Sequence, residues 1–142
     1  MNKKIIAGIC VVAVLAFAFF MKGGATGNVV SAEEVVKIPL SEISSTAKFY
    51  SEEGSSFFVV KDSEGNIKTA FDACDVCGGS KGYRQEGEDM VCNNCGRHFA
   101  IDQLGEQNIY GGGCWPSYLE HAIEGDFVVI QKSNLQKGSY MF

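Results

Sequence analysis

Two copies of a C-x-x-C-G motif, at residues 74–78 and 92–96, constrain this chain more than any other feature. Two residues between the cysteines let one tight turn aim both thiolates at a single ion, and the glycine that follows allows a backbone with positive φ. The 14 residues between the two cysteine pairs, 78–91, have the length of a hairpin, which would bring the second pair beside the first. The spacing therefore predicts a tetrahedral four-sulfur site of the zinc-ribbon or rubredoxin kind. The predicted ligands are Cys74, Cys77, Cys92 and Cys95.

The identity of the metal stays open at this point, because four thiolates suit zinc, a single iron or an iron–sulfur cluster. Two metal-free alternatives also stay open. In an exported protein the pairs could be disulfides, or they could be redox-active dithiols. A redox-active C-x-x-C lies at the beginning of a helix, which lowers the thiol pKa, whereas glycines follow both pairs here. This difference favours a metal site.

A further cysteine, Cys114, follows three glycines and precedes Trp115 and Pro116. Glycines let the backbone approach another group closely. Two interpretations stay open: an additional thiol at the metal site, or a buried free cysteine that packs as a small apolar residue. The two histidines, His98 and His121, are interpreted as structural or surface residues, because four cysteines already complete a tetrahedral site.

The amino-terminal region predicts a membrane anchor. Residues 5–21 are 17 uninterrupted uncharged residues, about 25 Å of helix against a hydrocarbon core of about 30 Å. Lysines precede the segment within residues 1–4, so the positive-inside rule keeps this end cytoplasmic. Residues 22–32 are then a flexible tether, and residues 33–142 an extracytoplasmic domain. The alternative is a cleaved signal peptide, with the cut near Ala32.

Charge excludes one class of partner. Residues 31–142 carry nine basic and 17 acidic groups, a net charge of −8. A nucleic-acid-binding surface needs clustered Lys and Arg, so we expect no nucleic-acid partner. No phosphate loop, metalloprotease motif or nucleophile elbow occurs. The chain is therefore interpreted as a binding or electron-transfer protein rather than an enzyme.

The exported part predicts a small, mostly-β domain that contains the double knuckle. β-favouring runs predict strands, and turn-forming residues at 62–66 and 87–89 predict two hairpins. A proline near its start and Gly125 beyond its end predict a short helix over residues 116–123. The expected strands are residues 35–40, 56–61, 67–71, 82–86, 90–91, 126–131 and 139–142.

Several of these segments together resemble one known family, the FtrD-like membrane iron–sulfur-containing proteins. The resemblance spans roughly residues 35–142, and it is carried by residues 70–77, 81–87 and 90–96 and by Gly112-Gly113-Cys114 with Pro116. It implies a membrane-tethered metal domain that works beside an iron permease and a periplasmic iron-binding protein in high-affinity iron uptake. It also implies that Cys114 belongs to the family motif. Many relatives carry a polytopic membrane part, whereas this chain predicts a single membrane segment.

These sequence features are therefore consistent with three functions. The first is an anchored iron or electron-transfer component of an uptake system. The second is a redox-inert scaffold with a structural zinc ribbon that binds a membrane partner. The third is a thiol oxidoreductase or metal chaperone that uses Cys114.

Overall fold

The computed structural model describes residues 34–77, 81–105 and 114–142. The chain divides into two units, residues 1–30 and 31–142, and the described residues all belong to the second. The predicted membrane segment, residues 5–21, lies outside the described residues. Within the part of the chain that is described, no helix combines the length and the apolar character needed to cross a bilayer.

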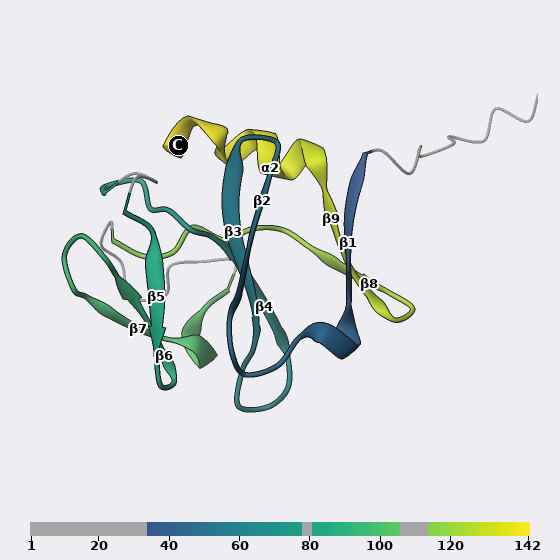
Figure 1. Ribbon diagram of the computed structural model, residues 1–142, viewed down its shortest axis with the longest axis horizontal. Coiled ribbons are helices and arrows are strands. Elements are labelled where there is room, and N and C mark those ends of the chain that lie inside the picture. The colour runs from purple at the N-terminus through teal and green to yellow at the C-terminus, as the bar shows by residue number, and fades with distance from the viewer. Residues whose placement is uncertain (1–33, 78–80, 106–113) are drawn as a thin grey trace, which may run out of the picture. The chain divides into compact units, whose positions relative to one another are not determined.

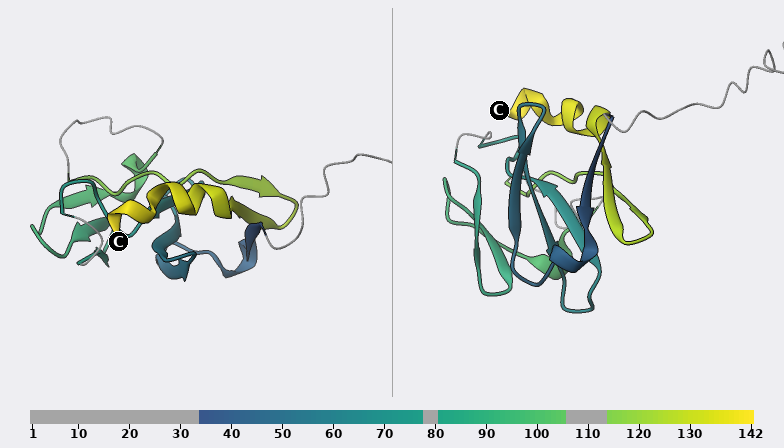
Figure 2. Two further views of the ribbon diagram at one scale, coloured as in Figure 1. Left: turned by 90° about the horizontal axis from the view of Figure 1, so that it is seen from above. Right: turned by 45° about the vertical axis from the view of Figure 1, so that its right-hand side comes forward.

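Three small antiparallel sheets make up the described part of the second unit, and Figures 1 and 2 show them side by side. Their strand orders are β1-β9-β8, β2-β3-β4 and β5-β6-β7. One short helix, α2 (Lys132–Gly138), follows β9 within these residues and leads into a 3₁₀ turn at Ser139–Met141. The strands are β1 (Val35–Pro39), β2 (Lys48–Glu52), β3 (Ser55–Lys61), β4 (Ile67–Phe71), β5 (Tyr83–Glu86), β6 (Asp89–Cys92), β7 (His98–Ala100), β8 (Ala122–Glu124) and β9 (Phe127–Gln131). The predicted mostly-β domain is thus confirmed.

Strand β3 is central because both of its faces are buried. Successive side chains of a strand point to opposite faces, and Phe57 and Val59 pack with β1, β9 and α2 in one apolar cluster. Phe58 and Val60 point the other way and pack in a second cluster with the sheet β5-β6-β7. All four side chains are fully buried. The strand that reads as a continuous apolar run in the sequence therefore separates two cores, and the second of them supports the cysteines.

The predicted hairpin of β3 and β4 is confirmed, and its turn is held by Asp62. One carboxylate oxygen of Asp62 accepts the amides of Glu64 (3.0 Å) and Asn66 (2.7 Å), and the other accepts the Asn66 side-chain amide. Burial alone would oppose ionisation of Asp62, but these hydrogen bonds outweigh it and lower the pKa of the carboxyl. The local turn chemistry visible in the sequence is therefore what closes this hairpin.

The hairpin of β5 and β6 is also present, with Tyr83 opposite Cys92 and Glu86 opposite Asp89. The chain then returns as β7, which the sequence analysis did not predict. A 3₁₀ turn, Ile101–Gln103, joins this sheet to the β3–β4 hairpin, because both carboxylate oxygens of Asp102 accept hydrogen bonds from Ser63 at 2.7–2.8 Å. These contacts fix the position of the cysteine-bearing sheet beside the central one.

Two secondary-structure predictions are wrong. Residues 116–121 are not helical, since Tyr118 forms an isolated β-bridge with Ala70, and residues 122–124 form β8. The reason is tertiary: the edge of β4 offers free backbone groups, and the amide of Phe71 and the carbonyl of Thr69 pair with Ser117 and Leu119. Residues 139–142 are not a strand either, because they continue α2 as a 3₁₀ turn that buries Met141 against the first core. Weak local propensity yields to packing in both places.

Candidate metal centre

Three chain segments bring their cysteines to one end of the second core. The loop after β4 carries Cys74 and Cys77, the β6–β7 turn carries Cys92 and Cys95, and the segment that runs along β4 begins with Cys114. The two-residue spacing predicted a tight turn at each pair. In the second pair the Gly96 amide donates to the Cys92 carbonyl at 2.9 Å, and Gly96 has a φ of 70°. Such a φ is costly for any residue with a Cβ atom, which explains the glycine after this pair.

The Cys114 segment owes its position to irregular pairing with β4. The carbonyl of Ser117 accepts the Phe71 amide at 2.8 Å, whereas the Ser117 amide donates to the Ala73 carbonyl at 3.2 Å. In regular antiparallel pairing the Ser117 amide would donate to the Phe71 carbonyl. Its acceptor is instead the carbonyl two residues later, that of Ala73. This shift moves Cys114 past the position opposite Cys74 and toward Cys77.

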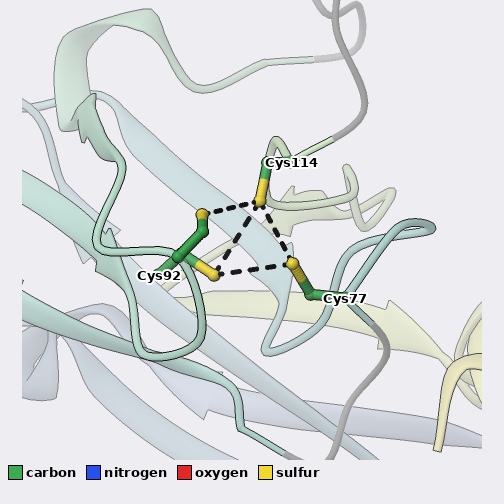
Figure 3. A group of neighbouring side chains, drawn as sticks. Cys77, Cys92 and Cys114 are labelled. Atoms are coloured by element: carbon green, nitrogen blue, oxygen red, sulfur yellow. Dashed lines mark hydrogen bonds between the residues drawn. The ribbon is translucent and has the colours of Figure 1, made fainter.

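The sulfur atoms of Cys77, Cys92, Cys95 and Cys114 lie within 4.8 Å of one another, and Figure 3 shows Cys77, Cys92 and Cys114 turned toward a common point. Cys114 is 3.0 Å from Cys95, 3.3 Å from Cys77 and 3.9 Å from Cys92, measured between sulfurs. Cys92 and Cys77 are 4.0 Å apart. A tetrahedral ion with metal–sulfur bonds of about 2.3 Å holds its sulfurs about 3.8 Å apart. The four thiols are therefore spaced as the ligands of a single ion would be.

The sulfur of Cys74 does not belong to this group of four. Cys74 is only 1% exposed and packs within the second core. Its sulfur accepts the backbone amide of Cys77 at 3.1 Å. The structure thus places the two sulfurs of the first motif in different environments, one in the group and one beneath it.

The group lies at the boundary between core and solvent. Cys92 is buried, Cys77 and Cys114 are half-buried, and Cys95 is exposed. Burial raises the pKa of the Cys114 thiol, and the hydrogen bond with Cys114 lowers the pKa of the Cys95 thiol. Thiolates are the ligating form, so a metal ion that binds to this group must displace the thiol protons.

Two arginine side chains of the cysteine-bearing sheet, Arg84 and Arg97, contact groups other than the cysteine sulfurs. Arg84 donates to the Asn93 side chain at 2.9 Å and pairs with Glu86, and the Arg97 guanidinium lies over the Phe99 ring, 5.8 Å from its centre. These contacts hold both guanidinium groups in place on the surface of the cysteine-bearing sheet.

Tyr83 is the residue at this site that the sequence analysis missed. Its ring packs edge-on against Phe58 and Phe99 in the second core, and its hydroxyl donates to the carbonyl oxygen of Cys114 at 2.9 Å. Its amide donates to Asp72 at 2.6 Å. Burial raises the pKa of the Asp72 carboxyl to about 6 despite this hydrogen bond. A lone tyrosine in a strand carries no signal of such a role in one sequence.

The two histidines lie apart from the group of four sulfurs. His98 is exposed on β7 and contacts Asp89 at 3.1 Å. His121 is half-buried, and its Nδ1 lies 2.8 Å from the Thr69 hydroxyl. Of the metal-ligating side chains in the described residues, only cysteines form a group close enough for one ion. Thiolates are the protein ligands of iron–sulfur centres and of rubredoxin-type iron, and they also hold structural zinc, so the donor set fits either metal.

Comparison with known proteins agrees with this chemistry. No curated protein matches the chain. The sequence model of the family described as membrane iron-sulfur containing protein FtrD-like matches residues 39–142, which include every described cysteine and nearly all of the described domain. The chain therefore belongs to the FtrD-like family of membrane iron–sulfur-containing proteins.

Proposed function

We propose that this protein is a membrane-anchored, extracytoplasmic iron-binding protein that serves as an accessory or electron-transfer component of an iron-uptake system. The observation that carries the proposal is the group of four cysteine sulfurs within 4.8 Å of one another, in a chain of a family described as iron-sulfur containing. Iron held by thiolates supplies a one-electron couple, which a protein that delivers or reduces iron needs.

The burial of the four thiols supports a role in electron exchange rather than a purely structural one. Cys92 is buried against the core, whereas Cys95 is exposed at the surface. A site with one exposed ligand lies within reach of a docked partner, and the apolar core around its buried ligand limits access of water to that side of the centre. The spacing of the sulfurs supports a single ion, so mononuclear iron is the form we propose.

The direct test is the metal content and the redox behaviour of the native protein. The full chain, purified anaerobically in detergent, is expected to hold about one iron per chain, as a four-cysteine site implies. Thiolate-to-iron absorption bands should bleach on reduction and return on reoxidation. A colourless protein with one zinc would contradict the proposal and support the structural zinc scaffold. Acid-labile sulfide would contradict the mononuclear form and identify a cluster.

The membrane anchor and its orientation are a separate part of the proposal. They rest on the uncharged residues 5–21 with lysines before them. Protease added to intact spheroplasts is expected to remove the domain and leave a membrane-bound fragment. A protected domain would show that the orientation is wrong. Release of a soluble domain without protease would show cleavage near Ala32.

An iron permease and a periplasmic iron-binding protein are the partners that the family resemblance suggests. Site-specific photocrosslinking from Val76, which is 68% exposed beside Cys77, tests for such a partner in whole cells. We expect crosslinks to proteins encoded with an iron transporter, at increased yield when iron is scarce. The exposed residue Phe49, on β2 of the central sheet, is the matched control position. Equal crosslinking from both positions would argue against a docking site at the centre.

A further inference from the structure

We infer that Cys114, and not Cys74, is the fourth ligand of the metal centre, and that Cys74 is a positioning residue that stays outside the coordination shell. The inference rests on the proposed function only in requiring that the site binds a metal. It reverses the ligand set that the two C-x-x-C-G motifs predict by themselves, since it takes one ligand from the first motif, two from the second and one from a distant segment.

The distances give the first argument. Each coordination position of a tetrahedral site needs a sulfur close to the other three. Cys114 lies 3.0–3.9 Å from its three neighbours, so none of them is appreciably farther away than the edge of about 3.8 Å that bonds of about 2.3 Å require. The Cys114 sulfur is close to all three of the others, which favours a ligand over an accessory thiol beside a site completed by the two motifs.

The backbone gives the second argument. Ser117 and Leu119 pair with β4, and the pairing of Ser117 with Ala73 brings the chain toward Cys77. The Tyr83 hydroxyl then holds the carbonyl of Cys114 at 2.9 Å. Cys114 is therefore held by backbone contacts that do not involve its sulfur, as expected of a preorganised ligand. A cysteine that merely filled the core would not need its backbone held at the surface of that core.

The surroundings of Cys74 give the third argument. Its sulfur is buried at 1% exposure in an apolar cluster with Phe58 and Tyr83. It accepts the Cys77 amide at 3.1 Å, and that hydrogen bond fixes the turn from which the Cys77 side chain reaches the other three sulfurs. Groups that orient a ligand in this way raise metal affinity without touching the ion, and their loss typically lowers it about 10- to 100-fold.

Cobalt substitution distinguishes the two ligand sets. The full chain in detergent, made anaerobically and loaded with Co²⁺, reports its ligands through the thiolate charge-transfer and ligand-field bands. We expect Cys114→Ser to lose one of four thiolate contributions, about a quarter of the charge-transfer intensity, and to show the spectrum of three sulfurs and one oxygen. Cys74→Ser and Cys74→Ala are expected to keep the four-sulfur spectrum. The matched control is Cys10→Ser, which removes the cysteine within residues 5–21.

Affinity separates a positioning role from a packing role. We expect Cys74→Ala, which removes the acceptor of the Cys77 amide, to lower Co²⁺ affinity about tenfold. Cys74→Ser keeps an acceptor at that position and should recover most of the loss. Circular dichroism of each variant checks that the fold is retained, and the alanine variant serves if serine is not tolerated in this apolar site.

The outcomes that overturn the inference are distinct from those that overturn the proposed function. A three-sulfur spectrum from either Cys74 variant would make Cys74 a ligand, and a four-sulfur spectrum from Cys114→Ser would exclude Cys114. Equal affinity of Cys74→Ala and the unchanged protein would remove the positioning role. The cobalt spectra do not depend on the native metal, so a protein that holds zinc in the cell would contradict the iron-uptake function and leave the ligand assignment standing. A protein that binds no Co²⁺ would overturn the assignment itself.

Discussion

The hydroxyl of Tyr83 donates a hydrogen bond of 2.9 Å to the carbonyl oxygen of Cys114, across 31 positions of sequence. Tyr83 belongs to β5, and its ring is buried between Phe58 and Phe99 in the second core. Cys114 belongs to a segment that pairs with β4 of the central sheet. This one contact therefore joins the core of the cysteine-bearing sheet to the backbone of Cys114, whose thiol belongs to the group of four.

Replacing Tyr83 by Phe tests that connection. The change removes only the hydroxyl, and loss of a neutral hydrogen bond costs about 0.5–1.5 kcal/mol. We expect the fold to persist and metal release to a chelator to become several-fold faster, because Cys114 is held less firmly. Stopped-flow chelator assays on the loaded protein measure the release. Tyr140→Phe is the control, since its exposed hydroxyl donates to the Asp75 carboxylate and not to a cysteine; identical release rates in all three proteins would contradict the expected role.

Gly82 and Gly87 offer a matched pair at the two ends of β5. Both have positive φ, 61° and 62°, so alanine at either position costs about 1–2 kcal/mol in backbone strain. A Cβ atom at Gly82 would also lie 2.5 Å from the Asp72 carboxylate, whereas one at Gly87 meets nothing within 4 Å. We expect Gly82→Ala to cost a further 1–3 kcal/mol or so from the steric clash. Urea unfolding of both variants measures the difference, and equal losses would show that Asp72 moves aside freely.

The stability of the domain should depend on the protonation of His121. Burial lowers the pKa of this imidazole below its ordinary value of 6.5, so the folded state favours the neutral ring. The stabilisation is fully present above pH 6.5 and is lost as the pH falls through the lower pKa of the folded protein. We expect His121→Gln to flatten this part of the pH profile of the free energy of unfolding. His98→Gln removes the other histidine of the chain; a profile that flattens equally in this control would refute the assignment to His121.

Removal of the metal should loosen one sheet selectively. Cys92 lies in β6, inside the second core, so a bound ion is linked to the packing of β5, β6 and β7. Binding of structural Zn²⁺ contributes about 10–16 kcal/mol of folding free energy in zinc-finger peptides. We expect chelation to abolish hydrogen-exchange protection in β5–β7 while β3 and β9 keep theirs. Uniform loss of protection across all three sheets would show instead that the domain unfolds as one unit.

How much of this protein the sequence predicts depends on the range of the interactions. The β3–β4 and β5–β6 hairpins were predicted correctly, because turn residues such as Asp62 act on backbone amides within four positions of themselves. The predicted helix over residues 116–123 is wrong, because the backbone groups that pair with Ser117 and Leu119 belong to β4, about 50 residues earlier. The sequence of residues 116–123 contains no local signal that a distant strand has an unpaired edge.

The cysteines show the same division. The sequence by itself determined that thiols would gather, since the two-residue spacing of each cysteine pair predicts a tight turn, whatever surrounds it. Only the tertiary structure decided which sulfurs face one another. Pairing along β4 and the Tyr83 hydroxyl bring Cys114 to the group of four, and burial in the second core places the Cys74 sulfur beneath it. Motif spacing controls the direction of side chains over a few residues, whereas a coordination shell requires three segments to converge, and that convergence follows from the packing of whole sheets.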